Sequence, residues 1–227
     1  MRADDTRRHA VLVAVAQHLA GRDPGHPLRV GIDGVCGAGK STFARELVAE
    51  LVRLGRPAVH LDSDGFHHVR ARRRRNSDDQ ARGYYDDAYD LEAVAERVLR
   101  PLGPGGDRRY AVAVHDLETD AVLTDVEADA AEDVVVVFDA TFLQRGRLRE
   151  HWDEVVFLRV DEAVATQRGV DRDAAALGGT QEARAAYDRR YMAACRLYLA
   201  EEDPERRASI VLDHTDPSRP MVVRLGT

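Results

Sequence analysis

A glycine-rich segment of eight residues strongly restricts the folds open to this chain. It reads Gly34-Val35-Cys36-Gly37-Ala38-Gly39-Lys40-Ser41, a complete match to the pattern G-x-x-x-x-G-K-[ST]. Such a loop wraps its backbone N–H groups around phosphates, and its lysine ammonium reaches the β- and γ-phosphate oxygens. Lysine and arginine together number 33, and Lys40 is the only lysine. The segment therefore predicts a nucleoside-triphosphate site.

The residues around the loop have the context that this pattern needs. Leu28 to Ile32 is a short apolar run that predicts a strand leading into the loop. Ser41 to Leu54 carries apolar residues at helical spacing and stops at Gly55, so it predicts the following helix. Thr42 either contacts the α-phosphate or caps this helix.

Alternating strands and helices along the chain predict an α/β fold of the P-loop NTPase type. Besides the first strand, apolar runs at residues 58–61, 134–138, 155–160 and 209–212 predict a mostly parallel, five-stranded sheet flanked by helices. Residues 110–114 and 121–126 predict the two strands of a small β excursion, and residues 90–102 predict a helix before it. We expect two parts: an N-terminal helical extension over residues 1–25, and a nucleotide-binding domain over residues 26–227.

Composition excludes several classes of function. The net charge is −7 and the pI is near 5.7, which argues against nucleic acid as a partner. No apolar run approaches the length of a membrane span, and the first residues lack a signal-peptide pattern. The two cysteines, Cys36 and Cys195, form no disulfide framework, so we expect reduced thiols and a cytoplasmic protein.

Polar residues at the predicted strand ends are candidates for chemistry, because ligands of parallel sheets bind at those ends. Ser41 is the expected first ligand of Mg²⁺. Asp64 follows the second strand and can orient an acceptor hydroxyl and take its proton; Asp62, beside it, either shares that role or makes a turn. Asp139 ends the strand at residues 134–138, where a carboxylate can hold the metal directly or through water.

Arginines provide further candidates. Arg168 and Arg172 are four residues apart on a predicted helix and can reach a transferring phosphoryl group together, unless they are simply solvated. Residues 70–75 contain five arginines in six positions, which either recruit an anionic substrate or form a solvated stretch. His67 and His68 lack a third ligand at metal spacing, so zinc is not expected.

Taken together, these segments resemble the uridine kinase group of the phosphoribulokinase/uridine kinase family, over roughly residues 28 to 220. The matching stretches are the loop at residues 34–41, residues 61–66, 87–90, 137–140, 168–173 and 208–213. The resemblance implies that Asp64 is the base and a metal-shell residue, and that Asp87 binds sugar hydroxyls. It also implies that Arg168 and Arg172 belong to a lid over about residues 168–182.

The resemblance is weaker where the acceptor binds. Tyr85-Asp86 replaces the usual His-Pro, Asp139-Ala140 replaces the usual Glu-Gly, and the region expected to bind the base reads Val114-His115-Asp116. The residues expected to contact the acceptor are Asp64, Phe66, His67, Tyr85, Asp87, His115 and Arg168. The expected metal ligands are Ser41, Asp64 and Asp139.

We therefore expect an ATP- and Mg²⁺-dependent kinase of a small-molecule hydroxyl, in the first instance the 5′-hydroxyl of a nucleoside such as uridine or cytidine. A non-nucleoside alcohol, related to pantothenate, ribulose phosphate, glycerate or a sugar, is an alternative acceptor. A nucleotide-dependent regulatory ATPase is a third hypothesis. The sequence leaves open the preference for ATP or GTP, and whether copies of the chain form a homo-oligomer.

Overall fold

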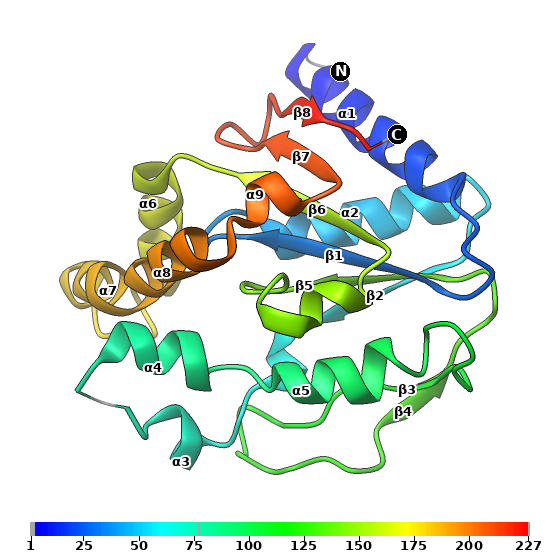
Figure 1. Ribbon diagram of the computed structural model, residues 1–227. Helices are drawn as coiled ribbons and strands as arrows, with labels where there is room; N and C mark the ends of the chain where they lie inside the picture. The colour runs from blue at the N-terminus through cyan, green and yellow to red at the C-terminus, as the bar shows by residue number, and fades with distance from the viewer. Residues whose placement is uncertain (1–2, 77, 227) are drawn as a thin grey trace.

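The computed structural model describes residues 3–76 and 78–226 and centres on a six-stranded sheet (Figure 1). The strand order is β2-β5-β1-β6-β7-β8. Five strands are parallel, and they confirm the five predicted ones: β1 (Leu28–Gly34), β2 (Ala58–Asp62), β5 (Val135–Asp139), β6 (Glu154–Arg159) and β7 (Ile210–Asp213). The sixth strand, β8 (Met221–Arg224), pairs antiparallel with β7 and was not predicted. All four residues of β8 are exposed, although three of them are apolar.

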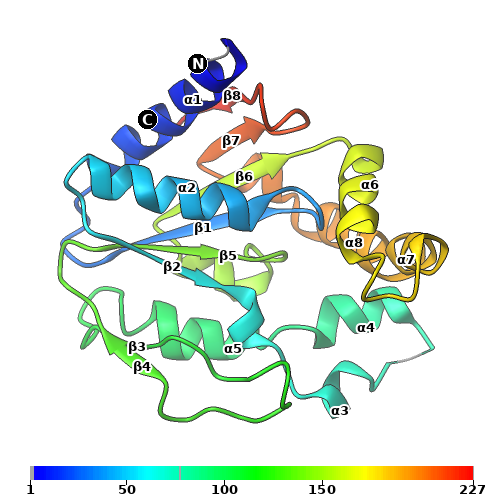
Figure 2. The same cartoon turned by 180° about the vertical axis from the view of Figure 1, so that it is seen from behind.

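Each face of the sheet is covered by its own hydrophobic core, which explains the continuous apolar runs of the strands. Val135 and Val137 of β5 face the core that includes α2 (Lys40–Arg53), whereas Val136 and Phe138 face the core that includes α5 (Leu91–Val94). The five-residue π-helical segment η2 (Ala95–Leu99) extends α5, in place of the single regular helix predicted at residues 90–102. Figures 1 and 2 show α2 and α5 on opposite sides of the sheet.

The N-terminal helix α1 (Ala3–Ala20) belongs to the core of the main domain. Val15, Ala16 and Leu19 are fully buried, in the same cluster as residues of α2 and β1. Arg8 also donates to the Glu46 carboxylate of α2 at 2.6 Å. The predicted helix is present, and its apolar side chains form part of the hydrophobic core of the domain.

The β excursion is a two-stranded antiparallel sheet of β3 (Arg109–Ala111) and β4 (Glu127–Asp129). β3 overlaps the first predicted strand. The second prediction, residues 121–126, ends one residue before β4; in that stretch only Val122 forms a bridge, with His115. β4 is polar and largely exposed, so its sequence lacks the apolar signal on which the prediction relied.

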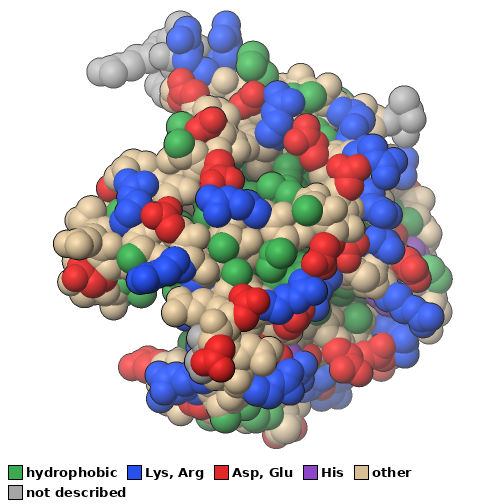
Figure 3. Space-filling view, turned by 60° about the vertical axis from the view of Figure 1, so that its left-hand side comes forward, with side chains coloured by type: hydrophobic (Ala, Val, Ile, Leu, Met, Phe, Trp, Pro, Cys, Tyr) green, Lys and Arg blue, Asp and Glu red, His purple; other side chains and the backbone are tan. Residues whose placement is uncertain are grey.

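The remaining helices gather mainly at one end of the sheet, as Figure 2 shows for α3, α4, α6, α7 and α8. Figure 3 turns this side of the molecule forward; basic and acidic side chains are interspersed over it, and a notch opens at its left edge. The helices are η1 (Ser63–Phe66), α3 (Arg70–Arg73), α4 (Gln80–Asp87), η3 (Gly146–His151), α6 (Glu162–Asp173), α7 (Thr180–Ala186), η4 (Tyr187–Tyr191), α8 (Met192–Glu202) and α9 (Pro204–Arg207). The predicted lid, residues 168–182, comprises the end of α6, a loop and the start of α7.

Candidate active site

The glycine loop connects β1 to α2, as predicted, and its glycines are required by geometry. Gly37 has φ of +78°, and a Cβ added there would lie 2.1 Å from the carbonyl oxygen of Ala165. Gly39 is in the left-handed region at the N-terminus of α2, which has no side-chain cap. The uncapped first turn leaves N–H groups and the positive end of the helix dipole available to an anion.

The ammonium of Lys40 lies against the loop. Its Nζ donates to the carbonyl oxygens of Gly34 at 3.1 Å and Val35 at 2.9 Å, and to the Thr141 hydroxyl at 3.0 Å. Phosphate oxygens can replace these neutral acceptors with stronger, charge-assisted ones. Thr141 follows β5 by two residues and was not predicted. Its position just past the end of a buried strand was the one sequence signal that could have indicated a role in the site.

Ser41, at the start of α2, meets Asp139, at the end of β5. The Ser41 hydroxyl donates to Asp139 Oδ2 at 2.7 Å, and the Nε2 of His60, on β2, lies 2.6 Å from the other carboxylate oxygen. The strand register places Asp139 between Ile32 of β1 and Asp62 of β2. Asp139 therefore lies near both the glycine loop, which follows β1, and His60 of β2. His60 therefore helps to orient the carboxylate, although its sequence position alone gave no sign of this.

Asp64 projects into the same region from η1. Its side chain is 80 % exposed, while the Asp62 carboxylate accepts the Asp64 N–H at 3.0 Å and so makes the turn. The pKa of Asp64 is raised, first by the partial desolvation that the neighbouring protein imposes on this exposed side chain, and also because Asp62 and Asp139 add negative charge. A carboxylate with a raised pKa is a better proton acceptor than an ordinary aspartate.

These groups line one cavity of about 410 Å³. It brings together the predicted residues Lys40, Ser41, Asp64, Asp139 and Arg172. The complete lining is Cys36, Gly37, Lys40, Ser41, Ser63, Asp64, Tyr84, Tyr89, Asp139, Thr141, Arg172 and Asp173. The glycine loop with its Lys40 ammonium, the Asp64 carboxylate and the Ser41–Asp139 pair thus face one cavity. Such a cavity suits a polyphosphate together with a second substrate.

The oxygen donors of this cavity fit Mg²⁺. The ion prefers oxygen ligands and keeps several waters, so it needs only one or two protein carboxylates beside substrate phosphates. The Ser41 hydroxyl and the carboxylates of Asp64 and Asp139 supply this chemistry. Among the residues whose side chains the structure describes, no group of three or more His, Cys, Asp or Glu is placed to hold a metal by itself.

The two arginines of α6 point to different places. Arg172 lines the cavity, where it donates to Asp173 at 2.7 Å and to the Tyr187 hydroxyl at 3.2 Å. Arg168 instead donates to the carbonyls of His214 and Thr215, in the loop after β7. His214 in turn contacts the Ala38 carbonyl of the glycine loop at 2.9 Å. Arg168 is therefore placed to support the loop indirectly, and the structure does not bring it beside Arg172.

A second cavity of about 240 Å³ adjoins the first, and the two share Asp64, Tyr84, Tyr89 and Arg172 among their lining residues. His67 also lines it, with its ring stacked against Tyr89 at 4.5 Å. Burial lowers the pKa of His67 to about 4, so this histidine is neutral at pH 7. Tyr84 and Tyr89 were not predicted; their hydroxyls lie 3.0 Å apart.

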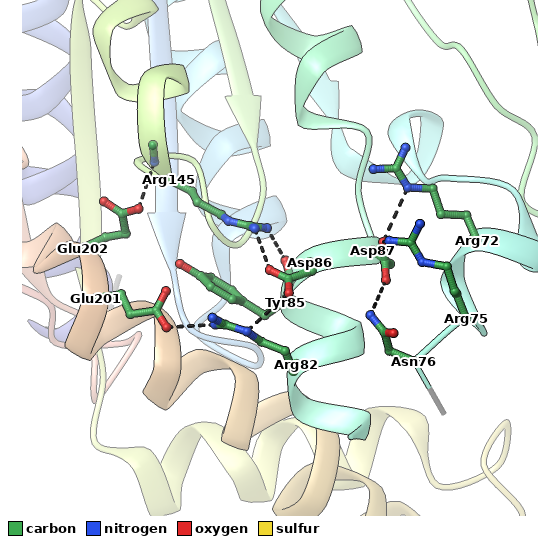
Figure 4. A network of polar contacts seen from close by, with 11 residues as sticks. Arg72, Arg75, Asn76, Arg82, Tyr85, Asp86, Asp87, Arg145, Glu201 and Glu202 are labelled. Carbon is green, nitrogen blue, oxygen red and sulfur yellow. Dashed lines mark hydrogen bonds and ion pairs between the residues drawn. The ribbon is translucent and has the colours of Figure 1, made fainter. Parts of the chain in front are cut away.

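Besides Arg168, four predicted acceptor-binding residues lie outside the lining of both cavities. Phe66 is fully buried against Phe138, and His115 is buried and bonded to Asp120 at 3.1 Å. Figure 4 shows the other two in a polar network: Arg145 lies over the Tyr85 ring, and Asp87 accepts from Arg75 at 2.9 Å. Tyr84 lines the cavities where Tyr85 was predicted, because neighbouring residues of a helix point in different directions.

The strand order, the glycine loop and the carboxylates at the strand ends define a P-loop kinase fold. The chain belongs to the phosphoribulokinase/uridine kinase family, whose model matches residues 29–202. It is 25 % identical to a uridine kinase of Leuconostoc citreum over 149 residues, which are 65 % of this chain and 69 % of that protein.

Two further comparisons extend this result. A pantothenate kinase of Rhodopseudomonas palustris is 32 % identical over 150 residues, which cover 61 % of this chain but only 46 % of that protein. The solved structure of a possible uridine kinase from Bacillus stearothermophilus superposes with a TM-score of 0.70 at 22 % identity, covering 89 % of this chain and 97 % of that one. At that identity the superposition establishes the fold. None of the helices described has both the length and the apolar character to cross a membrane.

Proposed function

We propose that this protein transfers the γ-phosphoryl group of ATP to a hydroxyl of a small molecule. The observation that carries the proposal is the convergence of Lys40, Ser41, Asp64 and Asp139 on one cavity. The uncapped N-terminus of α2 would hold the phosphates, and the Lys40 ammonium would neutralise the charge that develops on the β- and γ-phosphate oxygens. Bound Mg²⁺, held by Ser41 with Asp139 and Asp64, would supply charge stabilisation to the phosphates.

Asp64 would act on the acceptor. Its carboxylate would accept a hydrogen bond from the acceptor hydroxyl and take the proton as the hydroxyl oxygen bonds to the γ-phosphorus. In the same step the bond from that phosphorus to the bridging oxygen breaks, and ADP leaves with the electron pair. Arg172, at the wall shared by both cavities, would neutralise charge on the transferring group.

For the acceptor, a nucleoside such as uridine or cytidine is one candidate, supported by the similarity to the Leuconostoc citreum uridine kinase. A non-nucleoside alcohol is the second candidate. It is favoured because Tyr85, Asp87 and His115, expected at a sugar or base, lie outside the two cavities. The similarity to a pantothenate kinase agrees with it.

ADP release with a panel of alcohols tests the proposal, using uridine, cytidine, pantothenate, glycerate and sugars. We expect one class of acceptor to raise ADP release well above hydrolysis, and the substitution Asp64→Asn to lower kcat about 10²–10⁴-fold with that acceptor. Asp133→Asn, an exposed aspartate before β5, is the matched control. ATP hydrolysis that no acceptor stimulates would favour a regulatory ATPase instead.

A further inference from the structure

A third cavity, of about 470 Å³, continues from the acceptor side of the site. It shares Arg73, Tyr84 and Arg190 with the second cavity, so the three cavities form a series that begins at the glycine loop. Its lining is Arg70, Arg73, Arg74, Asn76, Gln80, Gly83, Tyr84 and Arg190. Four of these eight residues are arginine and none is acidic, so the cavity is strongly positive.

The arginines of residues 70–75 divide into two groups by their partners. Arg72 and Arg75 are paired with Asp87, which is only 1 % exposed, at 3.5 and 2.9 Å (Figure 4). Arg73 donates to the His68 carbonyl at 2.7 Å and lies 3.4 Å from Asp120. Within the part of the chain that the structure describes, no carboxylate forms an ion pair within 4 Å of the guanidinium groups of Arg70 and Arg74, although Asp120 lies near enough to Arg70 for the two charges to interact.

Arg190 reaches the cavity from the opposite wall. Its guanidinium lies 5.3 Å from the ring of Tyr84 and 5.2 Å from that of Tyr191, close enough for cation–π contacts. Among the described residues no carboxylate pairs with it. Three guanidinium groups without an ion-pair partner thus line one half-open cavity from two different parts of the chain.

The arginine segment is anchored at several points, while Arg70 and Arg74 themselves are exposed. Asp87 fixes it through Arg72, Arg75 and Asn76, whose amide donates to the carboxylate at 2.8 Å. At its start, the Arg70 N–H donates to Asp120 at 2.7 Å. Asp87 thus serves as an anchor: its carboxylate accepts hydrogen bonds from the arginine segment and does not line the cavities.

We propose that the acceptor carries an oxyanion, either a phosphate monoester or a carboxylate, which Arg70, Arg74 and Arg190 bind while its hydroxyl faces Asp64. Guanidinium groups bind both oxyanions through paired, charge-assisted hydrogen bonds. An uncharged nucleoside would leave all three groups without an ion-pair partner. This inference rests on the proposed kinase function and specifies its substrate class.

Acceptor pairs that differ in one anionic group test the inference by ADP release: ribose and ribose 5-phosphate, and glycerol and glycerate. We expect the anionic member of at least one pair to have the higher kcat/KM, and which pair responds distinguishes phosphate from carboxylate. Arg74→Gln and Arg190→Gln should each raise KM for that acceptor about 10- to 100-fold, with little change in kcat or in KM for ATP. Arg189→Gln, an exposed neighbour outside the cavity, is the matched control and should change neither value.

Binding of the anion alone provides a second readout if no member of the panel is turned over. Calorimetry would measure inorganic phosphate and acetate on protein saturated with a non-hydrolysable ATP analogue and Mg²⁺, so that the glycine loop is occupied. We expect binding of one of the two anions that disappears in Arg74→Gln/Arg190→Gln.

The inference is overturned if uridine or cytidine is the preferred acceptor, if the arginine variants leave KM unchanged, or if neither anion binds. The kinase proposal would survive each of these results. The kinase proposal fails on a different result, namely that the protein binds no nucleotide.

Discussion

Ser41 and Asp139 are 98 residues apart in the chain, yet the Ser41 hydroxyl donates to Asp139 Oδ2 at 2.7 Å. The contact joins the start of α2 to the end of β5, with His60 bonded to the other carboxylate oxygen. A hydroxyl and a carboxylate fixed in this way, beside a phosphate-binding loop, are placed to hold Mg²⁺ on a nucleotide.

Asp139→Asn should weaken the use of Mg²⁺ without unfolding the protein, because the amide oxygen can still accept from Ser41. We expect the Mg²⁺ concentration for half-maximal ADP release to rise about 10- to 100-fold. Removal of Mg²⁺ with a chelator should abolish transfer in the parent protein. An unchanged Mg²⁺ dependence in the variant would remove Asp139 from the metal site.

Lys40→Ala should lower kcat about 10²–10³-fold, since the ammonium is expected to stabilise charge that develops during transfer. Lys40→Arg should recover little of this activity. The Lys40 Nζ fits among three oxygen atoms within 3.1 Å, a space suited to a compact ammonium and not to a planar guanidinium. Steady-state kinetics at saturating ATP measure both variants. A rise in KM for ATP alone, with normal kcat, would contradict the assigned role.

Cys36 should react with iodoacetamide at unusually low pH. A hydrogen bond with the Cys195 thiol, together with the nearby Lys40 ammonium, lowers the pKa of Cys36 to about 6. Because the thiolate is the reactive form, the alkylation rate should rise through pH 6 and level off above it, whereas an ordinary thiol continues to gain reactivity to about pH 8.5. ATP with Mg²⁺ should protect Cys36, since this residue lines the nucleotide cavity.

Mass spectrometry identifies which cysteine is modified, and Cys36→Ser is the control. Cys195 should remain unmodified because it is buried and its pKa is raised by its contact with Cys36. A rate that still climbs about tenfold per pH unit between about pH 7 and 8 would show that the pKa is not lowered.

Leu19→Ala should destabilise the fold by about 2–5 kcal/mol, because Leu19 of α1 is fully buried in the core shared with α2. The exposed neighbour Gln17 provides the control, as Gln17→Ala should change stability by no more than about 0.5 kcal/mol. Chemical denaturation measures both. Equal stability of the two variants would mean that α1 is a separable extension.

The five parallel strands and the glycine loop could be predicted because their signals are local: continuous apolar runs and a fixed pattern of glycines. Asp64 and Asp139 followed from their places at strand ends. The acceptor side could not be predicted in the same way, because it depends on how distant segments pack. Tyr84 and Tyr85 are adjacent, and only the orientation of α4 decides which one lines the cavity. Arg190 reaches the arginine cavity from 115 to 120 positions away from Arg70 to Arg75, and no spacing rule connects them.

The central claim is that the cavity around Lys40 binds a nucleoside triphosphate together with Mg²⁺. Calorimetric titration of the folded protein with ATP, with and without Mg²⁺, tests it most directly. We predict one site per chain, weakened when Mg²⁺ is removed and strongly weakened in Lys40→Ala. A well-folded protein that takes up no nucleoside triphosphate in the presence of Mg²⁺ would contradict the account.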